Sequence, residues 1–191
     1  MIWAIIMAVV VVLDQATKIW IYNWIGPGSE EWVAHRVQQP IVEIIPGFFR
    51  FDYLENTGIA FGLGSDNKPA FVIFMIVSTA AIVALTVYLY RAKPQSRWAC
   101  TAIAFIVGGG IGNMIDRTFR GFVVDFIDFY GIWGYHFNVA DSFVCIGGGM
   151  LFVWCVLELI REGKKTGKKS EGAVEPSDEA DSSQDAGSEQ P

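Results

Sequence analysis

The sequence predicts an all-α membrane protein, with four transmembrane helices, a small extracytoplasmic β-sheet cradle and an interfacial loop or helix. Three observations predict this fold. The residues are 52% hydrophobic and only 18% charged, below the globular average of about 25% charged. A short segment at 49–53 alternates aromatic and charged residues, which is the period of a strand. Finally, four apolar runs approach the ~20 residues that span a ~30 Å hydrocarbon core, at about 1–22, 69–90, 98–117 and 138–160.

The charge distribution separates a membrane domain from a tail. The net charge is −6, but residues 170–191 contain seven acidic and no basic residues, which leaves +1 for the remainder. Residues 162–191 contain almost nothing apolar, so they cannot bury enough surface to offset the entropy of ordering. We therefore expect a membrane domain at 1–161 and a disordered acidic cytoplasmic tail at 162–191. This pattern gives no reason to expect a nucleic-acid partner.

Basic residues predict the orientation of the four helices. Arg91, Lys93 and Arg97 follow the second run, and a basic cluster beginning at Arg161 follows the fourth. The positive-inside rule places both in the cytoplasm. Both termini are then cytoplasmic, and the insert 23–68 and the interfacial segment 118–137 lie outside. The first run lacks a basic n-region and a small-residue cleavage site, so we expect a retained helix rather than a signal peptide.

The cysteines and histidines give no sign of a disulfide or metal framework. All three cysteines lie inside apolar runs, and only two histidines occur. Zinc sites need paired ligands at short spacing, which this chain lacks. We expect no cofactor and no metal.

Polar residues in the helices form two groups. Asp14 and Lys18 are four apart on one helix face, which favours an internal ion pair, although Lys18 could also reach towards lipid phosphates. Asn113 and Arg117 share a face in the same way, with Asp116 beside them. We expect Asp116 to neutralise Arg117 or Lys18, and Arg117 to bind a peptide carbonyl or a lipid ester.

The outer segments supply further candidates. Asn56 precedes glycines at 58, 62 and 64, which suggest a flexible lid. Its amide could hold a substrate peptide or form an Asx turn, and the residues do not decide between these. Asp125 lies among apolar residues, a setting that raises the pKa of a carboxyl group. Asp128 is expected to be the more solvated of the two.

The fourth run begins with a pattern that has two interpretations. Asn138 followed three residues later by Asp141 resembles a capping box at a helix N-terminus. Acids at the ends of membrane spans also mark functional sites. Because Asp125 lies a short distance upstream, we expect Asp125 and Asp141 to meet at the outer membrane surface and hydrolyse a peptide bond. Capping and catalysis are compatible.

Five motifs together resemble the lipoprotein signal peptidase (signal peptidase II) family over roughly residues 8–160. They occur in the expected order with the expected spans between them. A single pair of aspartates would be weak support, whereas this set is specific. The motifs are LDQATK at 13–18, PGFFRFDYLENTGIAFG at 46–62, GGGIGNMIDR at 108–117, GFVVDF at 121–126 and FNVADS at 137–142.

The resemblance implies a bacterial inner-membrane aspartyl endopeptidase that cuts prolipoproteins just before a diacylglyceryl-modified cysteine. It implies that Asp125 and Asp141 are catalytic and that globomycin-type inhibitors bind. Lipidated prolipoproteins and membrane lipids would be its partners, and we expect a monomer. The supporting residues that it implies are Asp14, Lys18, Asn56, Asn113, Asp116, Arg117 and Asn138. The segment 26–40 and the acidic tail depart from the family pattern.

Two other classes of protein remain to be weighed. A small transporter could use intramembrane acids as a pathway, but the acids here gather at the outer ends of the runs and no inverted repeat is evident. A non-enzymatic assembly factor could use the acidic tail to recruit partners. Deletion of 165–191 separates that class from a peptidase.

Overall fold

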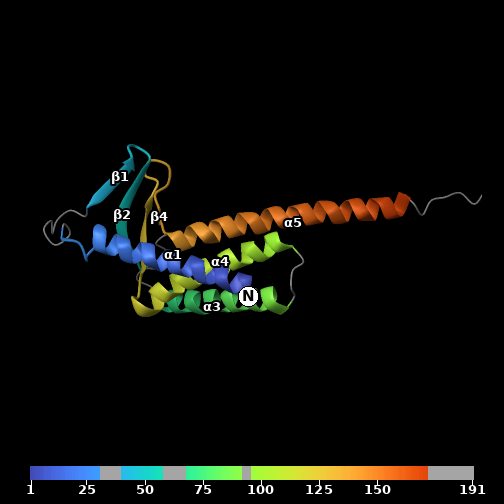
Figure 1. Cartoon of the computed structure of the whole chain (residues 1–191), viewed down its shortest axis with the longest axis horizontal. Helices are drawn as coiled ribbons and strands as arrows, with labels where there is room; N and C mark the ends of the chain where they lie inside the picture. The colour runs from blue at the N-terminus through green and yellow to red at the C-terminus, as the bar shows by residue number, and fades with distance from the viewer. Residues whose placement is uncertain (31–39, 58–67, 92–95, 172–191) are drawn as a thin grey trace, which may run out of the picture. The chain divides into compact units, whose positions relative to one another are not determined.

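The computed structural model describes residues 1–30, 40–57, 68–91 and 96–171, and its elements are shown in Figure 1. The predicted lid at 58–64, most of the segment 26–40 and most of the acidic tail lie outside the described residues. The helices are α1 (Ile2–Trp24), α3 (Lys68–Arg91), α4 (Arg97–Phe119) and α5 (Val139–Glu171). The strands are β1 (Ile41–Ile45), β2 (Phe49–Asn56), β3 (Val123–Asp128) and β4 (His136–Phe137).

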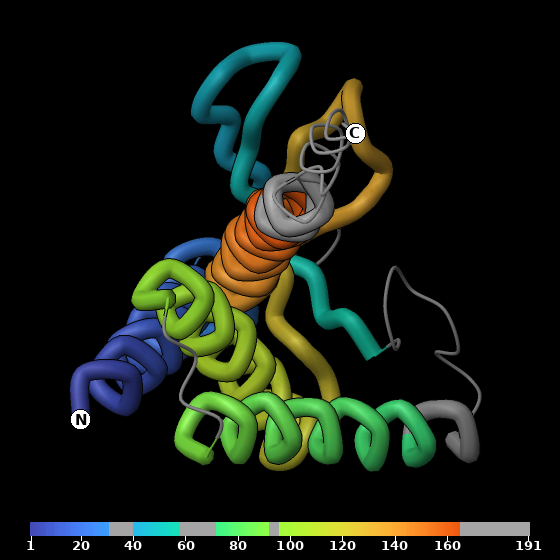
Figure 2. The backbone as a smooth tube through the Cα atoms, turned by 90° about the vertical axis from the view of Figure 1, so that its right-hand side faces the viewer, coloured from blue at the N-terminus to red at the C-terminus, as the bar shows by residue number. Residues whose placement is uncertain are grey.

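Four helical segments are long and apolar enough to cross a membrane, which confirms the predicted spans. They are Ile2–Trp24, Val72–Arg91, Arg97–Phe119 and Val139–Lys164. The apolar window of α4 is 56% buried, against 22% for α1 and 6% for α3. The helix α4 is therefore central and contacts both α1 and α3 (Figure 2).

Glycines of α4 allow its neighbours to approach closely. A Cβ atom added to Gly112 would lie 2.5 Å from Oδ2 of Asp14 on α1. A Cβ at Gly109 would collide with the backbone carbonyl of Ala140, in the first turn of α5. Small residues at such positions let helix backbones pack tightly in lipid. Here they also bring the polar ends of α1, α4 and α5 together.

The four strands form one antiparallel sheet in the order β1-β2-β3-β4. The interfacial segment was expected to be a loop or helix, but within residues 120–137 the structure has two strands joined by a turn. Val123, Val124 and Phe126 suit a pleated strand, and β3 pairs with β2 over most of its length. Residues distant in sequence are thus joined in one sheet.

Aromatic side chains attach this sheet to the end of α1. Tyr53 is buried in a cluster with Ile21 of α1 and Ile25, the residue that follows α1. Trp20 and Trp24 of α1 stack on each other, and each makes an edge contact with Phe51, at ring-centroid distances of 6.1 Å. Phe51 and Tyr53 of β2 therefore pack against the C-terminal end of α1, and these contacts hold the sheet there.

Candidate active site

Asp125 and Asp141 border one cavity of about 390 Å³. Asp125 comes from the middle of β3, and Asp141 from the first turn of α5. Asn56, Asn113 and Arg117 line the same cavity. The structure therefore brings five of the predicted site residues to one place, from four different elements.

Amide side chains hold both carboxylates in position. Nδ2 of Asn138 donates to Oδ1 of Asp125 at 2.7 Å and to Oδ1 of Asn113 at 3.0 Å. Nδ2 of Asn113 in turn donates to Oδ1 of Asp141 at 2.8 Å. The second oxygen of Asp125 accepts from Nδ2 of Asn56 at 2.8 Å. A continuous amide relay thus links the two carboxylates and restricts their rotation.

The capping box predicted from Asn138 and Asp141 is present. The backbone N–H of Asp141 donates to Oδ1 of Asn138 at 2.9 Å, and the N–H of Asn138 donates to Oδ2 of Asp141 at 3.2 Å. Asp141 therefore takes part in the cap of α5 and also lines the cavity. Capping fixes the Asp141 carboxylate at the helix N-terminus, where the helix dipole favours negative charge.

The environment of Asp125 raises the pKa of its carboxyl group to about 6. Burial is the largest cause, because the side chain is cut off from water, and the negative charge of Asp141 adds to it. Hydrogen bonds from Asn56 and Asn138 act in the opposite direction, since they stabilise the ionised form. The predicted raised pKa is therefore supported, with a second carboxylate as an additional cause.

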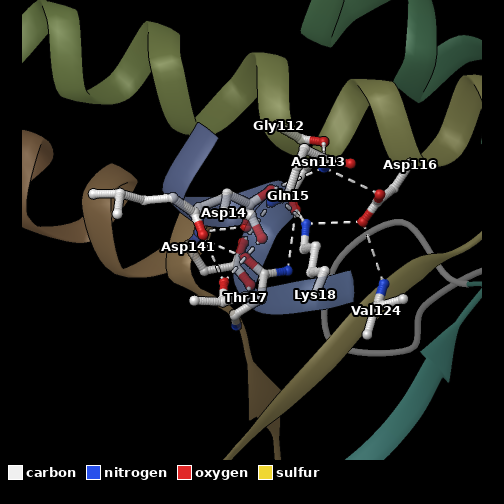
Figure 3. Close-up of polar contacts among 12 residues, drawn as sticks. Asp14, Gln15, Thr17, Lys18, Gly112, Asn113, Asp116, Val124 and Asp141 are labelled. Carbon is white, nitrogen blue, oxygen red and sulfur yellow. Dashed lines mark hydrogen bonds and ion pairs between the residues drawn. The ribbon is translucent and has the colours of Figure 1, made fainter. Parts of the chain in front are cut away.

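Lys18 anchors a buried network beneath the cavity (Figure 3). Its side chain is fully buried, and Nζ lies 2.8 Å from Oδ2 of Asp14 and 2.8 Å from Oδ2 of Asp116. It also donates to Oδ1 of Asn113 at 3.0 Å. An ammonium group has three N–H donors, so these acceptors use all of them. The predicted ion pair is confirmed, and the alternative in which Lys18 reaches lipid phosphates is wrong.

The two acids bonded to Lys18 connect different elements. Oδ1 of Asp14 accepts the backbone N–H of Ala140 at 2.9 Å, which ties α1 to α5. Asp116 pairs with Arg120 at 3.0 Å and accepts a bond from Gln15 at 3.2 Å. We expected Asp116 to neutralise Arg117 or Lys18, and Lys18 is indeed a partner. Its second cation is Arg120, one helical turn further on.

Arg117 projects into the cavity from α4. Its guanidinium carbon lies 5.1 Å from the ring centroid of Phe74 on α3, and it donates to the backbone carbonyl of Asn113 at 3.4 Å. A guanidinium over an aromatic ring gains cation–π stabilisation, and its fork of donors suits carbonyl oxygens. This position is compatible with the substrate role that the sequence suggested.

Comparison with known proteins identifies the family of this chain. Residues 6–157 match the sequence profile of the family described as "Signal peptidase (SPase) II". The chain belongs to the signal peptidase II family. It is therefore a peptidase and a multi-pass bacterial membrane protein, and its active-site candidates lie where α4, α5 and the sheet meet.

Relatives match over most of the chain. The lipoprotein signal peptidase of Serratia proteamaculans is 41% identical over 173 residues, covering 89% of this chain and 93% of that protein. That of Clostridium novyi is 35% identical over 157 residues, covering 81% and 94%. A solved structure described as a bacterial membrane enzyme is similar with a TM-score of 0.66 and 28% identity, covering 80% of this chain and 91% of that chain.

One expectation for this signal peptidase II member was wrong. Asp128 was expected to be solvated, but it is 3% exposed and accepts a hydrogen bond from Nε of Arg50 at 2.6 Å. The counterion comes from the neighbouring strand β2, so the sequence around Asp128 contains no sign of it. His136 and Asp52 lie beside this pair.

Sequence reasoning also missed Arg120 and Gln15. Arg120 follows Asp116 by four residues, a helical spacing that could have identified the pair.

Asp52, Asp128 and His136 form a cluster in which three potential metal-ligand atoms lie within 4.8 Å of one another. The Arg50 guanidinium already pairs with Asp128 there, so a protein cation balances these carboxylates.

Proposed function

We propose that this signal peptidase II member is an aspartyl endopeptidase that uses Asp125 and Asp141 to activate a water molecule. It cleaves the signal peptide from diacylglyceryl-modified prolipoproteins just before the lipidated cysteine. The observation that carries the proposal is that both carboxylates border one cavity and are joined by the Asn113–Asn138 amide relay. The similar proteins of Serratia proteamaculans and Clostridium novyi are lipoprotein signal peptidases, which supports the substrate class.

The chemistry follows from the proximity of two carboxyl groups. Like charges disfavour double ionisation, so one group retains a proton and the pair titrates as a unit. The ionised carboxylate takes a proton from water, whose oxygen attacks the scissile carbonyl carbon. The protonated carboxyl donates a hydrogen bond to the carbonyl oxygen as it gains negative charge. The C–N bond then breaks, and the leaving nitrogen takes up a proton from the pair.

The cavity is suited to a lipid-bearing peptide. Its lining includes apolar side chains from two helices, among them Ile82 and Leu85 of α3 and Ile106 of α4. Apolar walls of this kind would accommodate acyl chains, and the substrate would arrive laterally through the bilayer. Arg117 would then bind a peptide carbonyl or lipid ester, and Asn56 would hold the peptide while it positions Asp125. Globomycin-type inhibitors would compete for this cavity.

We further propose that the site faces the outer leaflet and that both termini are cytoplasmic. Basic residues after α3 and within the C-terminal part of α5 support this orientation through the positive-inside rule. Asp141 lies in the first turn of α5, at the opposite end of that helix from its basic residues. Single-cysteine labelling from outside intact cells tests this, because a cysteine in the Gly131–Gly134 turn should react and one after Arg161 should not.

The catalytic proposal is tested by Asp125→Asn and Asp141→Asn. Each variant should fold and insert, yet should fail to process lipidated prolipoprotein in a gel-shift assay. A prolipoprotein with serine in place of the lipidated cysteine is the substrate control, and it should not be cut even by the unaltered enzyme. Normal cleavage by either aspartate variant removes that residue from the mechanism.

A further inference from the structure

A ladder of alternating charges crosses the whole sheet. In the strand register Glu43 of β1 lies opposite Arg50 of β2, Arg50 opposite Asp128 of β3, and Asp128 opposite His136 of β4. Opposite charges on neighbouring strands stabilise a sheet. Because Glu43, Arg50 and Asp128 alternate in charge, a positive charge is favoured at the next position, the imidazole of His136. Arg50 also lies over the ring of Tyr130, at 4.6 Å from its centroid, which fixes the middle of the ladder.

His136 belongs both to this ladder and to the lining of the substrate cavity. Its Nε2 lies 3.1 Å from Oδ2 of Asp52 and 3.7 Å from Oδ2 of Asp128. Its side chain is 20% exposed, and the residue is part of the lining of the same cavity as Asp125 and Asp141. Within the described part of the chain no group bonds its Nδ1. Nε2 is thus bound by acids of the sheet, and Nδ1 is available to bind a ligand in the cavity.

The charged neighbours of His136 stabilise its protonated form. The hydrogen bond to Asp52 raises the pKa of the imidazole, burial lowers it, and the charges of Asp128, Asp52 and Asp125 raise it again, with a net increase. Arg50 on β2 pairs with both Asp52 and Asp128, the two acids that contact His136, and Arg117 of α4 lines the same cavity. An imidazolium carries N–H donors on both ring nitrogens.

We propose that His136 is a substrate-binding residue, whose Nδ1–H donates a hydrogen bond to a carbonyl oxygen of the peptide in the cavity. Asp52 is a positioning residue that acts through His136 by accepting the bond from Nε2. His136 lines the same cavity as Asp125, so a hydrogen bond from its Nδ1–H would fix the peptide near the two aspartates. This inference rests on the proposed function, because it needs the peptide to occupy the cavity.

Binding to a cleavage-inactive background tests the proposal without depending on the chemistry. The dissociation constant of a lipidated prolipoprotein signal peptide is measured on the Asp141→Asn variant from pH 5.5 to 8.5. We expect tight binding at low pH that weakens as the pH rises through the pKa of His136, because the charged donor is lost. His136→Gln in this background should weaken binding at low pH by about tenfold, the scale of one charge-assisted hydrogen bond, and should remove the pH dependence.

Two further variants separate binding from a structural role. His136→Lys keeps a cation next to Asp52 and should bind tightly over this whole pH range. Asp52→Asn removes the acceptor charge and should move the weakening of binding to lower pH. In the otherwise unaltered enzyme, His136→Gln should raise KM and leave kcat within about threefold.

Specific results would overturn the proposal. They are equal affinity of His136→Gln and its parent, an unchanged pH dependence after that substitution, or a loss confined to kcat. If His136→Gln does not fold, the pH profiles of His136→Lys and Asp52→Asn decide in its place. Cleavage by the Asp141→Asn background would instead refute the two-aspartate mechanism. The effect of His136→Gln on the KM of the otherwise unaltered enzyme would then still test whether His136 binds the substrate. The two failures are therefore distinguishable.

Discussion

The substitution Asp116→Asn tests whether the buried ion-pair network beneath the cavity stabilises the fold without taking part in catalysis. Asp116 is fully buried, pairs with Lys18 at 2.8 Å and with Arg120 at 3.0 Å, and does not line the cavity. Two acids and two bases (Asp14, Asp116, Lys18 and Arg120) balance one another in this network. Asparagine keeps the shape of the side chain and leaves one positive charge in excess.

The size of the effect follows from the partners that remain. Removal of one member of a buried ion pair costs about 3–5 kcal/mol of unfolding free energy. We expect the lower end, about 3 kcal/mol, for two reasons. Lys18 keeps Asp14, and the side chain of Arg120 is 30% exposed and can turn towards water. For a chain of this length the loss corresponds to a decrease in Tm on the order of 10 °C.

The assay is thermal unfolding in detergent, followed by the fluorescence of the seven tryptophans, with cleavage measured well below Tm. The Asp116→Asn variant should unfold at a lower temperature, and its turnover should stay within a few-fold of that of the unaltered enzyme. Glu158→Gln is the matched control, because Glu158 pairs with Arg161 at 3.4 Å on an exposed helix face, where ion pairs contribute little. An unchanged Tm together with lost turnover would show that Asp116 belongs to the catalytic machinery.

Three other predictions concern packing, pH and the tail. Gly112→Ala should lower the unfolding free energy by about 1–3 kcal/mol, because its Cβ would lie 2.5 Å from the Asp14 carboxylate. Gly148→Ala is the control, because Gly148 has open space around it and the substitution should leave the unfolding free energy unchanged. Equal Tm values for the two variants would contradict the close contact between α1 and α4 at Gly112. The value of kcat/KM should fall as the pH rises above about 6, because the carboxyl pair, in which the pKa of Asp125 is raised to about 6, then loses the proton that the reaction needs. The value of kcat should be maintained to higher pH because bound substrate excludes water; a kcat/KM that stays flat to pH 8 would refute this. Deletion of residues 165–191 should leave prolipoprotein cleavage unchanged, and loss of cleavage would favour a recruiting role for the tail.

Features that depend on local spacing could be predicted from the sequence. The four spans follow from the length of the apolar runs. The Asp14–Lys18 pair follows from a four-residue spacing, and the Asn138–Asp141 capping box from a three-residue spacing. Strand β2 was evident because Arg50 and Asp52 alternate with aromatic residues, so one face of the strand differs from the other.

Features that depend on distant partners could not be predicted in this way. Four of the six residues of β3 are apolar and β4 has only two residues, so no alternation between two faces stands out in the sequence. Asp128 obtains its counterion from Arg50, which is 78 residues away in the chain. The position of His136 between the ladder and the cavity requires the complete four-strand register. These features arise only when the sheet has formed.

The most direct test of the central claim is a double-mutant cycle on the two aspartates. Cleavage rates of lipidated prolipoprotein are measured for Asp125→Asn, Asp141→Asn and the double variant, at a sensitivity that reaches the uncatalysed rate. Residues that act as one unit give strongly non-additive losses. We predict that each single variant loses cleavage almost completely and that the double variant is no slower than either. Substantial cleavage by one single variant, or losses that multiply in the double variant, would contradict the account.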